Sequence, residues 1–195
     1  MRRRGRVLLG ENLKPTGPCL VLVAHQVSAE VSLDELGRQL GMSKNTVERY
    51  LDLLTKVFVV YARGGYSANL RKEVVKSKRW YFLDNGIRNA LLNDFSPLAL
   101  RNDKGALWEQ YFLNERIKYN HYSGNPPESY FWRTYDQQEI DLVEVRNKQT
   151  TAFECKWKQA PGKAPAAFAK AYPDAAFYIV HPGNYEQWVG GEAMA

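Results

Sequence analysis

Two helix-start signals separated by one glycine are the strongest constraint that this sequence places on its fold. Ser32 and Glu35 form a capping box, in which a hydroxyl and a carboxylate satisfy free amides of a first helical turn. The leucines that follow repeat at helical spacing up to Gly41, a residue that ends a helix at little cost because it adopts left-handed backbone angles. Ser43 then starts a second helix. The spacing predicts a helix-turn-helix.

The first turns of the second helix carry polar and basic side chains. A recognition helix contacts base edges and phosphates from these positions. The residues that we expect to contact nucleic acid here are Lys44, Asn45, Thr46 and Arg49. A small helical hairpin that serves only for packing is the alternative interpretation.

Two strands are expected next, at residues 57–62 and 79–83, with a turn at Gly64 and Gly65. Together they would form the wing of a winged helix over residues 18–83. A basic segment within or beside this hairpin is suited to phosphate contacts. Its cations are Arg71, Lys72, Lys76, Lys78 and Arg79.

The charge of the chain is unevenly distributed. The formal net charge is +6, with 27 Lys and Arg against 21 Asp and Glu over 195 residues. Residues 1–79 hold 15 of these cations and 7 of the acids, so the rest of the chain is slightly acidic. This asymmetry favours a polyanion such as DNA as the partner of the N-terminal part, although a solvated basic surface would have the same composition.

Composition indicates a folded globular protein, since 45% of the residues are hydrophobic. No apolar run of about 18 residues is present, so we expect no membrane span. The two cysteines, Cys19 and Cys155, are expected to be thiols in a cytoplasmic protein. The sequence gives no indication of the oligomeric state. The expected divisions are an irregular basic arm (1–17), the winged helix-turn-helix (18–83), a connector with a short helix (84–103), a second domain (104–182) and a C-terminal tail (183–195).

The second domain alternates helices and strands. We expect a helix at 104–119, strands at 129–133, 139–146 and 150–157, a helix at 164–172 and a strand at 175–181. Residues 147–149 form the hairpin loop between two of the strands. The order α-β-β-β-α-β makes the whole protein a mixed α/β chain.

Acidic and basic side chains are expected to gather on this hairpin. Glu154 and Lys156 share one face of a strand, and Asp141 lies on the neighbouring strand. Two carboxylates offer the oxygen ligands that Mg²⁺ or Mn²⁺ prefers, so Asp141 and Glu154 are the predicted metal ligands. Lys156 would stabilise charge at a phosphate, and Glu109 on the preceding helix would add a further carboxylate. A cross-strand salt bridge is the structural alternative.

The pattern Asp141…Glu154-Cys-Lys156 resembles the Asp…Glu-x-Lys signature of the restriction-endonuclease-like superfamily, and Glu109 matches a helical acidic residue of many members. Residues 24–180 more closely resemble the C-terminal region of a family of prokaryotic AAA-type ATP-binding proteins. The matching stretches, which are specific only in combination, are Gly41-Met-Ser-Lys-Asn-Thr-Val-Glu-Arg-Tyr50, Tyr81-Phe-Leu-Asp-Asn-Gly86, Trp108-Glu-Gln-Tyr-Phe-Leu-Asn-Glu115, Phe131-Trp-Arg133 and Glu139-Ile-Asp141-Leu.

This resemblance implies a winged helix followed by a restriction-endonuclease-like domain. Members of the family normally carry an N-terminal P-loop ATPase, but this sequence has no Gly-x-x-x-x-Gly-Lys-Ser/Thr, so we expect no ATP site. Three interpretations of the missing P-loop remain open: the chain is a fragment, the second half of a split gene, or a stand-alone relative of the family.

Three functions remain open at this point. The first is Mg²⁺-dependent hydrolysis of phosphodiester bonds in DNA. The second is a catalytically inactive module that binds DNA or a partner, where the partner would be an ATPase domain or chain. The third is a pure interaction domain.

Overall fold

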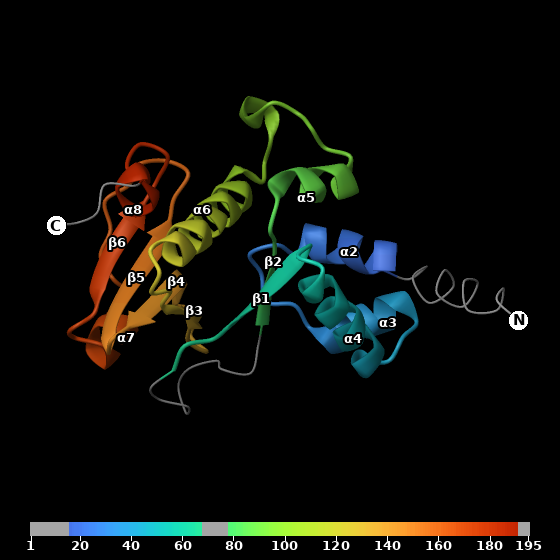
Figure 1. Ribbon diagram of the computed structural model, residues 1–195, viewed down its shortest axis with the longest axis horizontal. Coiled ribbons are helices and arrows are strands. Elements are labelled where there is room, and N and C mark those ends of the chain that lie inside the picture. Colours follow the sequence, from blue (N-terminus) through green and yellow to red (C-terminus); the bar gives the residue numbers. More distant parts are fainter. Residues whose placement is uncertain (1–15, 68–77, 191–195) are drawn as a thin grey trace, which may run out of the picture.

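The computed structural model describes residues 16–67 and 78–190 (Figure 1). The described chain is a mixed α/β structure with a two-stranded and a four-stranded sheet. Its N-terminal elements are α2 (Thr16–His25), α3 (Leu33–Leu40), α4 (Lys44–Lys56), β1 (Val60–Gly64), β2 (Lys78–Phe82) and α5 (Asn85–Leu92). The C-terminal elements are α6 (Lys104–Tyr122), β3 (Glu128–Arg133), β4 (Glu139–Arg146), β5 (Gln149–Cys155), α7 (Ala166–Ala171), β6 (Ala176–Val180) and α8 (Glu186–Val189).

The caps expected for the helix pair α3–α4 are present. The Ser32 hydroxyl accepts a hydrogen bond from the amide of Glu35, and Gly41 has a φ of +65°. The Ser43 hydroxyl accepts from the amide of Thr46 at the start of α4. The helices also pack closely, since a Cβ on Gly37 would lie 2.6 Å from the Met42 carbonyl oxygen. Local signals therefore predicted this part of the fold correctly.

Strands β1 and β2 pair antiparallel, from Val60 opposite Phe82 to Gly64 opposite Lys78. The predicted turn at Gly64 and Gly65 is wrong, because β1 continues through Gly64 and Gly65 forms a parallel bridge with Phe131 of β3. This bridge joins the two-stranded sheet to the C-terminal half. The expected phosphate contacts Arg71, Lys72 and Lys76 lie outside the described residues.

The C-terminal half has the predicted order α-β-β-β-α-β, from α6 to β6. Its sheet order is β3-β4-β5-β6, with β3, β4 and β5 antiparallel and β6 parallel to β5. Asn147 and Lys148 take φ values of +50° and +67° in the tight turn between β4 and β5. Helix α7 lies in the crossover from β5 to β6, as a parallel connection requires.

The predicted C-terminal tail contains an additional helix, α8. The Trp188 ring packs against the rings of Phe153 and Tyr178, with centroid separations of 5.3 and 4.3 Å. Residues 183–190 are therefore not a simple tail, because aromatic burial against the sheet stabilises a helix too short to form alone.

One hydrophobic core extends through both halves. Leu51 of α4, Tyr81 of β2, Phe112 of α6 and Phe153 of β5 belong to the same cluster of buried residues. A second, smaller cluster is built on Trp132 and includes Phe168 of α7. The helix-turn-helix and the four-stranded sheet are therefore packed as parts of one structure.

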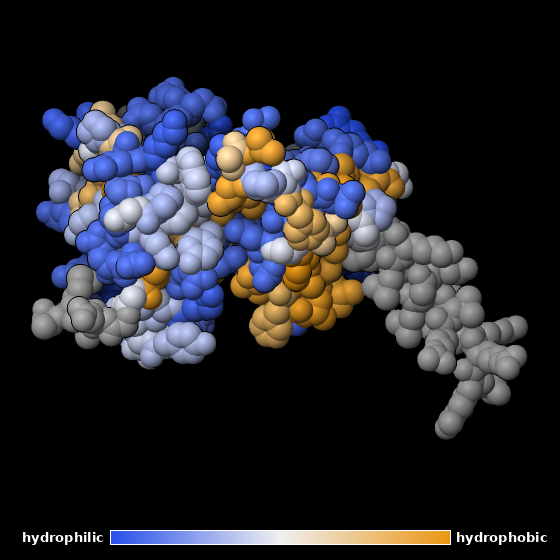
Figure 2. Space-filling model, turned by 90° about the horizontal axis from the view of Figure 1, so that it is seen from above, coloured by the Kyte–Doolittle hydropathy of each residue, from blue (hydrophilic) through white to orange (hydrophobic). Residues whose placement is uncertain are grey.

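The connector between α5 and α6 exposes apolar side chains. Seen from above, apolar side chains gather over the middle of the molecule, while the C-terminal half is mostly hydrophilic (Figure 2). Phe95 and Leu100 of the connector remain 69% and 76% exposed. None of the described helices is both long and apolar enough to cross a membrane.

Candidate functional site

Strand β2 connects the two regions for which the sequence predicts a function. Successive side chains of a strand point to opposite faces. Lys78 and Trp80 line a groove between the hairpin and α4. Arg79 and Tyr81 point the other way and contact acidic residues of the C-terminal half.

The first half of α4 presents polar side chains to solvent. Lys44, Asn45 and Arg49 are exposed, while Thr46 is half-buried and its hydroxyl is 2.9 Å from that of Ser43 in the cap. Asn45 and Arg49 also line the groove that contains Lys78. Asn45 and Arg49 therefore share one accessible groove with Lys78. The Lys44 ammonium is exposed but lies 3.3 Å from the Asp34 carboxylate.

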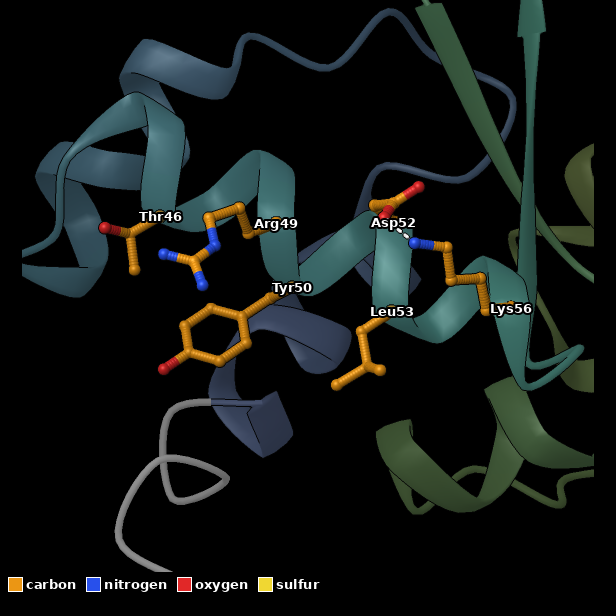
Figure 3. Close-up of a pocket in the computed structure, with 6 residues that line it drawn as sticks. All are labelled: Thr46, Arg49, Tyr50, Asp52, Leu53 and Lys56. Carbon is orange, nitrogen blue, oxygen red and sulfur yellow. Dashed lines mark hydrogen bonds and ion pairs between the residues drawn. The ribbon is translucent and has the colours of Figure 1, made fainter. Parts of the chain in front are cut away.

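A second hollow follows the length of α4 (Figure 3). Thr46 and Arg49 line its N-terminal end, and Tyr50 lies beside Arg49 in the view of Figure 3. At the other end the Lys56 ammonium lies 2.7 Å from the Asp52 carboxylate. Lys56 is therefore partly neutralised, and Arg49 is the cation that this hollow offers most freely.

The described residues 16–67 are less basic than the N-terminal sequence as a whole. Residues 16–67 contain five Lys and Arg and five Asp and Glu. The positive excess of residues 1–79 therefore comes from segments 1–15 and 68–77 and from Lys78 and Arg79. A basic contact surface on the described residues is consequently local to the start of α4 and to Lys78.

Arg79 is not on this surface, contrary to the prediction of a phosphate contact. Its side chain is 2% exposed, and its guanidinium Nη2 donates to Glu139 Oε2 at 2.7 Å. Its Nη1 lies 3.8 Å from Asp141 Oδ1, and the guanidinium stacks over the Phe131 ring at 4.6 Å. The alternation of β2 turns Arg79 inward, into the cluster of predicted catalytic carboxylates.

Asp141 is almost completely buried. Its Oδ2 accepts a hydrogen bond of 2.8 Å from the backbone amide of Cys155, so the carboxylate ties β4 to the end of β5. Burial raises the pKa of Asp141 well above its ordinary value, and the charges of Glu109 and Glu154 add to this effect. The Cys155 amide and Arg79 act in the opposite direction.

Glu154 and Lys156 form the pair expected on one strand face. The Lys156 ammonium donates to Glu154 Oε1 at 2.7 Å, and its side chain is 48% exposed. Burial raises the pKa of Glu154, while the bond from Lys156 opposes this rise. The second oxygen, Glu154 Oε2, is buried and accepts no hydrogen bond.

Glu109 of α6 lies in the same cluster. It accepts a hydrogen bond of 2.9 Å from the Tyr81 hydroxyl, and burial raises its pKa to about 7. The neighbouring side chains of α6 also bind β2, since Gln110 accepts from the Phe82 amide and Asn114 donates to the Phe82 carbonyl oxygen. The acidic residue and the amides together hold the hairpin against α6.

These carboxylates do not fit a divalent metal ion in this arrangement. Mg²⁺ requires near-octahedral oxygen coordination. Asp141 Oδ2 accepts a hydrogen bond from the Cys155 amide, and Asp141 Oδ1 faces the Arg79 guanidinium. Glu154 Oε1 accepts a hydrogen bond from Lys156. Across residues 16–67 and 78–190, no group of three or more His, Cys, Asp or Glu side chains could hold a metal ion.

Arg63 belongs to the cluster but was missed in the sequence. It lies directly opposite Arg79 in the hairpin, is 4% exposed, and stacks over the rings of Tyr61 and Tyr81 at 5.8 and 5.6 Å. Its Nη1 is buried without a hydrogen-bond partner. Only the strand register, which the sequence leaves undetermined, reveals that two arginines oppose each other here.

Comparison with known proteins gives matches in both halves. Residues 7–98 match a domain of unknown function, DUF8612, and residues 104–195 match another, DUF4143. Uncharacterised proteins of Mycobacterium tuberculosis and Mycobacterium bovis are each 33% identical to the chain over 169 residues, or 84% of the chain. The chain covers 37% of the length of these relatives. No solved structure matches it. The chain is thus similar to two domains of unknown function in succession and to part of longer mycobacterial proteins.

Proposed function

We propose that this chain is a nucleic-acid-binding module, in which a winged helix-turn-helix binds duplex DNA and a restriction-endonuclease-like domain supports it without cutting. The observation that carries this proposal is the accessible start of α4, where Lys44 is exposed and Asn45 and Arg49 line one groove with Lys78. Cations and an amide at the N-terminal end of a capped second helix suit phosphates and base edges.

Cleavage is not part of this first proposal because the carboxylates already have partners within the protein. Arg79 faces Asp141, Tyr81 donates to Glu109, and Lys156 donates to Glu154. Each of these interactions satisfies a buried or half-buried acidic group that would otherwise cost free energy. The cluster thereby joins the hairpin to the C-terminal half.

A protein partner fits the same proposal. The resemblance to AAA-type ATP-binding proteins implies an ATPase domain or a separate ATPase chain as that partner. Phe95, Leu98 and Leu100 of the connector are exposed and apolar, as is typical of protein contact surfaces. We propose the connector as the place where such a partner docks.

The DNA-binding proposal is tested by fluorescence anisotropy with a labelled duplex over a range of salt concentrations. Substituting Lys44→Ala, Arg49→Ala or Lys78→Ala should weaken binding and reduce the slope of log K against log salt by about 0.9 for each phosphate that the protein no longer neutralises. Lys170→Ala, which removes an exposed lysine from α7, is the matched control and should bind as the wild type does. Equal affinities and slopes in all four variants would contradict the proposal.

Mg²⁺-dependent cleavage is the second candidate function, and the arrangement of Glu154 and Lys156 favours it. The two side chains meet at a partly exposed position, and the charge of Glu154 contributes to the raised pKa of Asp141. This candidate requires a rearrangement that releases Asp141 from Arg79. Conversion of supercoiled DNA to nicked or linear forms by the wild type, and the absence of this conversion in Lys156→Ala, would establish it.

A further inference from the structure

The carboxylate cluster contains a positive charge of its own. Glu109, Asp141, Glu139 and Glu154 all act electrostatically on Arg79 or on one another. Arg79 is 2% exposed and lies 2.7 Å from Glu139 and 3.8 Å from Asp141. Buried carboxylates need a cation or hydrogen-bond donors, and here a guanidinium occupies the place where a bound cation would balance them.

The position of Arg79 is fixed from three sides. Its guanidinium lies 4.6 Å above the Phe131 ring of β3, and its backbone is held by β1 on one side and by a bridge to Glu30 on the other. Cation–π contact and strand pairing both restrict the side chain. These contacts hold the guanidinium beside the carboxylates.

This placement is not one that the hairpin alone would favour. Arg63 and Arg79 are directly opposed on neighbouring strands, and like charges at such positions repel. Arg79 Nε is also buried without a hydrogen-bond partner. The acidic residues of the C-terminal half compensate for the repulsion, so the interaction stabilises the assembly of the two halves rather than the hairpin itself.

We propose that the Arg79 guanidinium is the resident cation of the carboxylate cluster, and that by filling this place it keeps divalent metal ions out while it holds the β1–β2 hairpin to the C-terminal sheet. A metal ion at Asp141 would lie within a few ångströms of the guanidinium, and the two positive charges would repel strongly in a poorly solvated site. Metal binding therefore requires that Arg79 withdraws. The inference concerns the chain without nucleic acid and does not depend on DNA binding.

The test is a calorimetric titration of the full chain with Mn²⁺ in the absence of nucleic acid. We expect no saturable binding by the wild type at millimolar concentrations and a gain in affinity of at least about tenfold in Arg79→Gln, because a unit charge beside the site is removed. The double variant Arg79→Gln/Asp141→Asn should lose that gain. Arg79→Lys retains the charge and should behave as the wild type does.

Equal Mn²⁺ affinity in wild type and Arg79→Gln, or binding by neither, would overturn the proposal. Circular dichroism and a cooperative thermal transition show whether each variant folds. If Arg79→Gln does not fold, Arg79→Met decides, since it also removes the unit charge and keeps an apolar side chain over the Phe131 ring. We expect the same gain in Mn²⁺ affinity in this variant, and an unchanged affinity would refute the role of Arg79.

Discussion

Removal of the Arg116 guanidinium should be among the most destabilising single changes in the C-terminal half. Arg116 of α6 and Glu144 of β4 are 8% and 4% exposed. The arginine donates through Nε to both carboxylate oxygens at 3.1 Å and through Nη2 to Oε2 at 2.8 Å. Its Nη1 donates to the carbonyl oxygen of Trp188 in α8. One side chain therefore joins the long helix, the sheet and the C-terminal helix.

The magnitude follows from the charge that the substitution leaves behind. Arg116→Met keeps most of the volume, but Glu144 then retains only the bond of 2.6 Å from Asn120. An unpaired buried charge costs about 3–5 kcal/mol. For a chain of this size each kcal/mol lowers the melting temperature by about 2–4 °C, so we expect a fall of about 6–20 °C.

Urea and thermal unfolding measure this effect, with a matched control on the same helix. Lys118→Met removes the exposed ion pair with Glu115 and should change stability by less than about 1 kcal/mol. The double variant Arg116→Met/Glu144→Leu should recover most of the stability, because two apolar side chains leave no buried charge. Equal stability of Arg116→Met and Lys118→Met would contradict a stabilising role of the buried ion pair.

Three further predictions concern separate parts of the fold. Gly37→Ala should lower the free energy of unfolding by about 1–3 kcal/mol, because its Cβ would lie 2.6 Å from the Met42 carbonyl oxygen. A Cβ on Gly105 in α6 meets nothing within 4 Å, so Gly105→Ala should raise the free energy of unfolding by about 0.5–1 kcal/mol. The urea midpoints of the two variants check this. Burial raises the pKa of Glu109 from 4.5 to about 7, so the folded state retains a proton that the unfolded chain has released, and wild-type stability should fall as the pH rises between these values. Glu109→Gln should remove this fall, and parallel pH profiles of the two proteins would count against it. Trp188→Ala should lower the free energy of unfolding by about 2–4 kcal/mol, because no ring then packs on β5 and β6 at this position. Thermal unfolding measures this loss, and proteolysis after β6 should become faster.

The elements that the sequence predicted well are those defined by local signals. Capping hydroxyls and a left-handed glycine act within a few residues, so the α3–α4 pair was predicted together with its caps. The turn at Asn147 and Lys148 is equally local. Helix α8 was missed because it depends on Trp188 packing against the sheet, an interaction that no short-range pattern reveals.

The candidate site was predicted only in part for the same reason. Alternation along β5 correctly brought Glu154 and Lys156 together. The direction of Arg79 depends on how the hairpin docks on α6 and β4, and the position of Arg63 depends on the strand register. The charge pattern of the basic segment therefore predicted an exposed Arg79, whereas the fold buries Arg79 among carboxylates.

We propose above that the chain binds duplex nucleic acid without cutting it. A single gel-shift titration with an end-labelled duplex in the presence of Mg²⁺ tests both parts, with the recovered DNA analysed on a denaturing gel. We expect a retarded band that weakens as the salt concentration rises and in Arg49→Ala, and we expect DNA of unchanged length. Cut product that appears with the wild type and disappears in Asp141→Asn would contradict it, as would a duplex that is never retarded.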